Sequence, residues 1–363
     1  MKHWDVAIIG GGVIGLSLAL RLKEQSLTII IVEKREPAGE ATHAAGGMIA
    51  HCDPHTPAAL LPLVRASAKM YPDFVHEVET ESGEKIDFRN TGTIAVFAEP
   101  EVPLCEGARP IPALELTNLE PNLCLGEDSW FLPESCVDPR DLGRALEKAA
   151  RHRGVDFVTG AAVREVLTAG DRTTGVRTAH ATYHAGLVVN CAGAWAAQIA
   201  PLPIPTSPVK GQILCVVPQP VGAPGIRSFG IRGSELLHHV IRTPHIYIIP
   251  RSDGRILLGA TVEEAGFDKQ TNPETIKAMF ETAVQIAPVL KNTRMHDAWA
   301  GLRPGTPDHL PILGETSLSR YFAATGHYRD GIMLAPATAE VMTQLITGRK
   351  PAFDLAPFSP LRF

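Results

Sequence analysis

A short strand, a glycine-rich turn and a helix open this chain of 363 residues, and they limit its fold more than any other feature. Residues 5–9 form an apolar, β-branched run that ends at glycines, which is typical of a buried parallel strand. Residues 13–23 have the spacing of a helix, and residues 28–32 predict a second buried strand that ends at Glu33. Together they predict a right-handed βαβ unit.

The turn carries three glycines in the spacing Gly-x-Gly-x-x-Gly. In a dinucleotide-binding unit the first permits a tight turn, the second lets backbone approach a pyrophosphate, and the third lets the helix pack closely on the strand. The N–H groups and positive dipole end of the helix point at that pyrophosphate. A carboxylate 18 positions after the third glycine can accept hydrogen bonds from ribose hydroxyls. The alternatives are an ordinary strand-to-helix turn and, for the carboxylate, a solvated strand end. The predicted contacts are Gly10, Gly12, Val13, Ile14, Gly15, Glu33 and Lys34.

The glycine motif is shared by NAD and FAD proteins, so other segments must distinguish them. Residues 41–48 are rich in side chains too small to block a bound group, which suits the long, extended FAD. Residues 189–195 repeat this design, because a buried strand there ends in small residues. We therefore expect noncovalent FAD, since no cysteine near the C-terminus is placed for covalent attachment. The predicted contacts are Thr42, Ala45, Gly46, Gly47, Met48, Ala192, Gly193 and Trp195, the last mainly as packing.

The remaining patterns predict an α/β fold, in which an FAD-binding Rossmann-like (doubly wound) domain has an interleaved α+β substrate-binding domain. The expected FAD-binding domain comprises residues 1–53, 136–204 and 296–363, with a helix over 141–152, strands at 156–158, 186–190 and 322–325, and a last helix over 332–347. The expected substrate-binding domain comprises residues 54–135, with a helix over 60–78 and a strand pair over 86–97, and residues 205–295, with short strands and a helix over 273–287.

Composition excludes several classes of function. A formal net charge of -5 without a basic stripe argues against nucleic acid. Six cysteines without a C-x-x-C pair predict unpaired thiols in a reducing compartment, and no histidine spacing indicates a metal site. The apolar run over residues 6–20 is broken by glycines and too short to span a bilayer, so we expect no membrane segment and a cytoplasmic location.

Two arginines near the end of the chain are candidate anion ligands. Arg303 lies between Leu302 and Pro304, in what reads as an apolar loop, where an unpaired charge is costly unless an anion meets it. A guanidinium forks onto a carboxylate through two bonds, so it suits an amino-acid substrate. The alternative is a structural salt bridge, which is a stronger competitor for Arg329 because Asp330 follows it.

Four segments give the chain a resemblance to known proteins: residues 247–251 (YIIPR), 259–263 (GATVE), 300–304 (AGLRP) and 326–336 (GHYRDGIMLAP). Over nearly its whole length the chain resembles the amine-oxidising FAD flavoproteins of the D-amino-acid oxidase superfamily, and most closely the bacterial glycine oxidases of thiamine biosynthesis. The resemblance implies that Arg303 holds the substrate carboxylate and that Tyr247 and Arg329 complete the pocket, although Tyr247 could equally pack in a core. It also implies a backbone contact from Val163 to the adenine. Val262 stands where the family often has methionine.

The last helix would direct its positive end at the flavin ring, where negative charge develops on reduction. We expect Pro336 in its first turn, and a hydrogen-bonding or packing role for His327 rather than that of a catalytic base. The expected contacts in this segment are His327, Tyr328, Arg329, Asp330, Gly331 and Ile332, together with Arg303.

The resemblance implies an enzyme that oxidatively deaminates a small amino acid: glycine, or else sarcosine or a small D-amino acid. The products would be the 2-oxo acid, ammonia and hydrogen peroxide, with dioxygen as electron acceptor. The resemblance also implies that the enzyme forms a homo-oligomer, as in relatives. Three alternatives remain open. One is a dehydrogenase that passes electrons to a quinone or partner protein, and another is a non-catalytic FAD-binding subunit. The third is nicotinamide-dependent hydride transfer.

Overall fold

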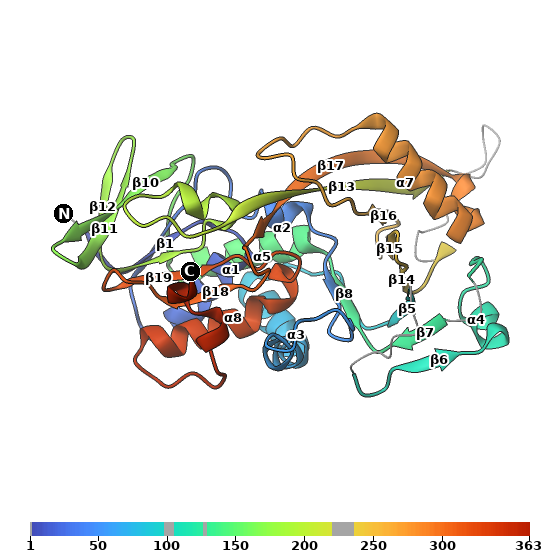
Figure 1. Cartoon of the computed structure of the whole chain (residues 1–363), viewed down its shortest axis with the longest axis horizontal. Helices are drawn as coiled ribbons and strands as arrows, with labels where there is room; N and C mark the ends of the chain where they lie inside the picture. The colour runs from blue at the N-terminus through green and yellow to red at the C-terminus, as the bar shows by residue number, and fades with distance from the viewer. Residues whose placement is uncertain (1, 98–104, 126–128, 220–235) are drawn as a thin grey trace.

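Three β-sheets organise the chain in the computed structural model, which describes residues 2–97, 105–125, 129–219 and 236–363 (Figure 1). The first sheet contains β1 (His3–Ile9), β2 (Ile29–Val32), β9 (Asp156–Val158), β10 (Val163–Ala169), β11 (Arg172–Thr178), β12 (Thr182–Asn190), β18 (Ile312–Glu315) and β19 (Tyr321–Thr325). The second contains β5 (Thr93–Val96), β6 (Arg109–Ile111), β7 (Ser129–Leu132), β13 (Ser207–Pro218), β14 (Val240–Arg242), β15 (Tyr247–Pro250), β16 (Ile256–Gly259) and β17 (Thr293–Gly305). The third contains β3 (Met48–Ile49), β4 (Phe88–Arg89) and β8 (Ser135–Val137).

The first sheet confirms the predicted βαβ unit. β1 pairs in parallel with β2 and with β12, β2 pairs in parallel with β9, and β12 pairs in parallel with β19. Helix α1 (Val13–Lys23) has the predicted bounds and is buried on nearly every side, because it packs in one core with the sheet and with three further helices. These are α3 (Leu61–Ser82), α5 (Pro139–His152) and α8 (Gly331–Ile346). The α/β fold class is confirmed.

Two long strands distinguish the second sheet. β13 and β17 pair in antiparallel fashion and extend from the side of the molecule with both termini to the side with α7 (Pro273–Ile286) (Figure 1). The expectation of short strands over 205–295 is confirmed for β14, β15 and β16 and was wrong for β13, which has 12 residues. The strand pair over 86–97 was also wrong, because β4 pairs with β8 whereas β5 pairs with β7 and β14. The division into two domains stays a prediction, and β17 crosses the predicted boundary at 295.

Short helices lie between these strands and long helices or near the end of the chain. They are α2 (Ala41–Ala44), α4 (Ala113–Leu119), η1 (Gly193–Gln198), η2 (Pro288–Asn292), η3 (Ala356–Phe358) and η4 (Pro360–Arg362).

Helix α8 contains Pro336 in its second turn, one turn later than expected. Proline has no N–H, so the carbonyl of Ile332 four residues earlier loses its helical partner. The hydroxyl of Tyr71 on α3 donates to that carbonyl at 3.1 Å. The hydroxyl of Ser67, one turn earlier on α3, donates to the Met333 carbonyl at 2.6 Å. Helix α3 therefore supplies the hydrogen bonds that hold the first turns of α8 in place.

Candidate functional site

A cavity of about 770 Å³ lies at the carboxyl ends of β1, β2 and β12, between the first and second sheets. This is the edge at which open α/β sheets bind ligands, and the volume is within the usual range for a large ligand. With the exception of Gly15, every predicted site residue lines this cavity, from the glycine turn through residues 42–48 and 192–195 to Tyr247, Arg303 and residues 327–332. Their contacts with a cofactor stay predictions.

Two of the three glycines, Gly10 and Gly15, occupy positions that a residue with a Cβ could not. Gly10 has φ +101°, and a Cβ there would lie 2.6 Å from the Cys191 carbonyl oxygen. A Cβ on Gly15 would run into the Gly10 carbonyl, so Gly15 lets the helix pack closely on the turn. A Cβ on Gly12 would approach only the Thr42 hydroxyl, at 3.5 Å. The space over Gly12 is therefore open to a ligand at the N-terminus of α1.

The polar groups around the turn fit a dinucleotide. Glu33 is buried at the end of β2 and accepts the backbone N–H of Gly11 at 2.7 Å and that of Arg35 at 2.9 Å. A carboxylate has about four acceptor positions, so capacity remains for ribose hydroxyls. The Thr42 hydroxyl accepts the Val13 N–H at 2.9 Å and can still donate its own proton. The helix N-terminus, the open glycine turn and this carboxylate suit the pyrophosphate and ribose of FAD.

Residues 44–46 are fixed by side chains that sequence reasoning missed. The Arg251 guanidinium is fully buried and donates to the Gly46 carbonyl at 2.6 Å. The Trp299 indole donates to the Ala44 carbonyl at 3.2 Å, and the Arg140 guanidinium lies 4.2 Å from the Trp299 ring centroid. The signal for Arg251 in the sequence was its place directly after the apolar run 246–250.

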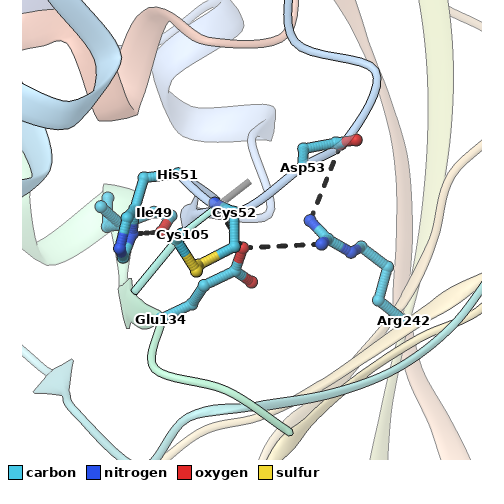
Figure 2. The surroundings of a disulfide bond; sticks show 7 residues. All are labelled: Ile49, His51, Cys52, Asp53, Cys105, Glu134 and Arg242. Carbon is cyan, nitrogen blue, oxygen red and sulfur yellow. Dashed lines mark hydrogen bonds and ion pairs between the residues drawn. A yellow bond between two sulfur atoms is a disulfide. The ribbon is translucent and has the colours of Figure 1, made fainter. Parts of the chain in front are cut away.

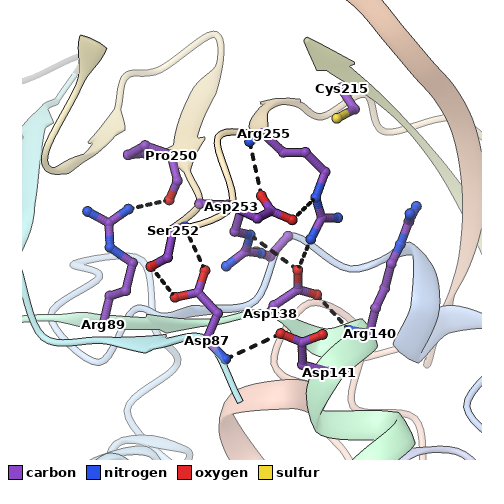
Figure 3. A network of polar contacts seen from close by, with 12 residues as sticks. Asp87, Arg89, Asp138, Arg140, Asp141, Cys215, Pro250, Ser252, Asp253 and Arg255 are labelled. Atoms are coloured by element: carbon purple, nitrogen blue, oxygen red, sulfur yellow. Dashed lines mark hydrogen bonds and ion pairs between the residues drawn. The ribbon is translucent and has the colours of Figure 1, made fainter. Parts of the chain in front are cut away.

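Arg140 and Arg251 also contact Asp138, which lies in a network of polar contacts (Figure 3). Asp138 caps α5 by accepting the Arg140 N–H at 2.8 Å, and it accepts Arg255 Nη2 at 2.6 Å. The Arg251 Nε lies 4.0 Å from the same carboxylate. The network therefore holds the β15–β16 hairpin against the start of α5.

Arg303 lies in strand β17 rather than in the expected loop. Its Nη1 donates to the carbonyl oxygens of Thr261 at 3.0 Å and Lys210 at 3.3 Å, and the backbone of Gly211 lies against its guanidinium. Burial lowers its pKa, yet an arginine keeps its charge in proteins. Within the described part of the chain no carboxylate forms an ion pair with it, which argues against the salt-bridge alternative.

Tyr247 begins β15 and faces the same cavity. Its ring packs on Gly259 and Gly46, where an added Cβ would lie 2.6 and 3.1 Å from the phenol oxygen. Burial raises the pKa of Tyr247 to about 12, so the phenol stays protonated and can donate a hydrogen bond.

The segment before α8 brings three titratable groups to the cavity. Arg329 is exposed, lies over the Tyr328 ring at 5.4 Å, and makes no ion pair with Asp330 in the regions described. Burial, followed by the charge of Asp53, raises the pKa of Asp330 to about 7. Burial lowers the pKa of His327 to about 3, and its Nε2 lies 3.0 Å from the Thr338 hydroxyl. This geometry agrees with the hydrogen-bonding role expected for His327.

The cysteines overturn one prediction. Cys52 and Cys105 form a disulfide (Figure 2), and Cys124, Cys136, Cys191 and Cys215 are free. Cys52 and Cys105 are 53 residues apart in sequence, and the tertiary fold brings their side chains together. A ring nitrogen of His51 lies within 4.8 Å of both sulfurs, but sulfurs joined in a disulfide are not thiolate ligands. The cytoplasmic location stays a prediction. The expectation of unpaired thiols no longer supports it, because Cys52 and Cys105 are joined.

Among the helices described, none is long and apolar enough to cross a membrane.

Comparison with known proteins places these features in a family. Residues 5–345 match the family DAO, FAD dependent oxidoreductase. The chain is 34% identical to the bifunctional protein ThiO/ThiG of Synechocystis sp., over 99% of this chain and 54% of that protein. It therefore spans about half the length of this bifunctional relative. It is 31% identical to the hydrogen cyanide synthase subunit HcnC of Pseudomonas aeruginosa, over 100% of this chain and 97% of that protein.

A solved structure agrees with the sequence comparisons. The fold matches glycine oxidase from Geobacillus kaustophilus with a TM-score of 0.89 at 28% identity, over 100% of both chains. Since the family match covers nearly the whole chain and the cavity fits the cofactor, the chain belongs to the DAO family of FAD-dependent oxidoreductases.

Proposed function

We propose that this enzyme oxidises a small amino acid, glycine in the first place, to the 2-oxo acid, ammonia and hydrogen peroxide. One observation carries the proposal. Arg303 presents a guanidinium to the cavity without an acidic partner in the described residues, and its two backbone acceptors fix the plane of the group. A carboxylate is the complementary ligand for such a fork. One similar protein of known structure is named a glycine oxidase.

In this reaction the bound FAD supplies the two-electron acceptor. Arg303 binds the substrate carboxylate and sets its orientation, while the protonated phenol of Tyr247 donates a second hydrogen bond to it. Burial lowers the pKa of His327 to about 3, which makes its imidazole a weak base, and its Nε2 lies at the Thr338 hydroxyl, so it is a poor acceptor for a substrate proton. Gly211 leaves room for the guanidinium, and Gly259 leaves room for the phenol. The chain therefore contributes position and charge rather than a catalytic base.

The test is anaerobic addition of glycine, sarcosine and D-alanine to the purified holoenzyme, followed by flavin absorbance. We expect bleaching that recovers in air, with hydrogen peroxide formed in proportion to substrate consumed. A flavin that no small amino acid bleaches would refute amino-acid oxidation by this protein.

A second candidate is transfer of electrons to a partner protein or quinone. The observation in its favour is the 31% identity, over nearly all of both chains, to a protein named as a subunit. It predicts bleaching by an amino acid with slow recovery in air and fast recovery with an artificial electron acceptor. Peroxide released at the rate of substrate oxidation would exclude it. A role in supplying thiamine biosynthesis stays a prediction, supported by the similarity to ThiO/ThiG. A homo-oligomeric state also stays a prediction, supported by the resemblance.

A further inference from the structure

Asp53 lines the part of the cavity that holds the proposed substrate clamp. We call this part the substrate end, defined by Tyr247, Arg242, Arg303, Arg329 and Asp53, all of which line the cavity. We propose that Asp53, held by Arg242, is a selectivity residue that disfavours substrates with a second carboxylate. The proposal rests on the proposed function, because it concerns the same site.

Arg242 connects Asp53 to the substrate clamp. It stands directly opposite Tyr247 in the pairing of β14 with β15, and residues directly opposite in antiparallel strands project on the same face. Its Nη1 lies 3.7 Å from Asp53 Oδ2, and its Nη2 lies 3.5 Å from Glu134 Oε1 (Figure 2). The Glu134 side chain is 1% exposed and that of Asp53 is 38% exposed. Asp53 is therefore the member of this pair of acids that a substrate can meet.

The backbone before Asp53 is fixed at two points. Cys52 is joined to Cys105, and its N–H donates to Glu134 Oε1 at 3.1 Å (Figure 2). The same Glu134 oxygen pairs with Arg242. Disulfide, carboxylate and guanidinium thus form one connected group, which holds the Asp53 charge at the cavity wall.

The charge of Asp53 acts across the substrate end. Burial is the larger cause of the raised pKa of Asp330, and the Asp53 charge raises that pKa further; Asp330 follows Arg329 at the start of α8. Two like unit charges about 7 Å apart weaken binding by roughly 10- to 100-fold at an effective dielectric constant of about 20. A second substrate carboxylate close to Asp53 would meet a repulsion of this kind. Removing the Asp53 charge removes this repulsion, while Arg242 keeps its pairing with Glu134. Glycine has no second carboxylate, so the Asp53 charge does not disfavour it in this way.

The test compares the holoenzyme with its Asp53→Asn variant. In the first measurement, kcat/KM is determined for glycine, iminodiacetate and D-aspartate. We expect the ratio of either dicarboxylate to glycine to rise about tenfold or more in Asp53→Asn. Asp53→Glu keeps the charge, and Asp73→Asn removes an exposed charge outside the cavity lining. Both controls should keep the wild-type ratio. A ratio within about twofold of wild type in Asp53→Asn overturns the proposal.

A second measurement separates this proposal from the proposed function. The dissociation constants of acetate and malonate are measured by titration calorimetry, which needs no turnover. We expect the affinity for malonate relative to acetate to rise about tenfold in Asp53→Asn, even if no amino acid is oxidised. Unchanged relative affinity, or no binding of either acid, overturns the proposal. Flavin absorbance verifies that the variant is folded, and Asp53→Ser replaces it if Asp53→Asn does not fold.

Discussion

Removal of the Arg303 guanidinium is the most direct test of the proposed chemistry. In Arg303→Ala the substrate carboxylate loses two charge-assisted hydrogen bonds, each worth about 1.5–3 kcal/mol. The sum, about 3–6 kcal/mol, corresponds to a loss of roughly 10²- to 10⁴-fold in kcat/KM for glycine. We expect most of this loss in KM, because the clamp contacts the carboxylate in the ground state and the transition state alike.

The structure adds a cost that must be separated from catalysis. Arg303 donates to the carbonyl oxygens of Thr261 and Lys210, so the alanine variant also leaves these acceptors without that donor. Arg303→Lys is the matched control, since it keeps the charge but not the planar fork. It should recover part of the lost affinity for glycine.

The assay measures peroxide release against glycine concentration, with flavin absorbance and thermal unfolding as measures of folding. A folded, FAD-loaded Arg303→Ala protein whose kcat/KM for glycine stays within about threefold of wild type would refute the clamp. An equal loss with the carboxylate-free substrate methylamine would show that the variant acts through something other than the carboxylate.

Three further predictions follow from single contacts. Tyr71→Phe leaves the Ile332 carbonyl without a donor, so the free energy of unfolding in urea should fall by about 1–3 kcal/mol; a change below about 0.5 kcal/mol would contradict this account. Gly211→Ala places a methyl group against the Arg303 guanidinium, so kcat/KM for glycine should fall about tenfold or more; unchanged kinetics would mean that the guanidinium lies elsewhere. The pKa of Asp330 rises from 3.8 to about 7 on folding, so its contribution to stability is complete below pH 4 and is lost as pH rises through 7. In FAD-free protein, Asp330→Asn should therefore lose less Tm than wild type between pH 5 and 8, and equal losses would count against the raised pKa.

Local patterns predicted the strands and the helix around the glycine turn well. The bounds of α1 agree with its sequence spacing, and β1 and β2 agree closely, because apolar periodicity and glycine placement are local properties of the chain. The last helix was predicted within one residue at each end, with Gly348 after it at φ +73°. The second sheet was predicted less well. Its strand order joins segments from three distant parts of the chain, and nothing in the spacing of Thr93–Val96 indicates that it pairs with Val240–Arg242.

The amino-acid sequence by itself determined that a glycine turn opens a helix between two buried strands, and that arginines stand in apolar surroundings near the end of the chain. Only the tertiary structure decided what those groups meet. It placed Arg303 on a long strand rather than in a loop, and it joined Cys52 to Cys105. It also placed Asp53 against Arg242. The physical reason is that periodicity reports which face of an element is buried, whereas contacts between distant segments depend on how whole sheets pack together.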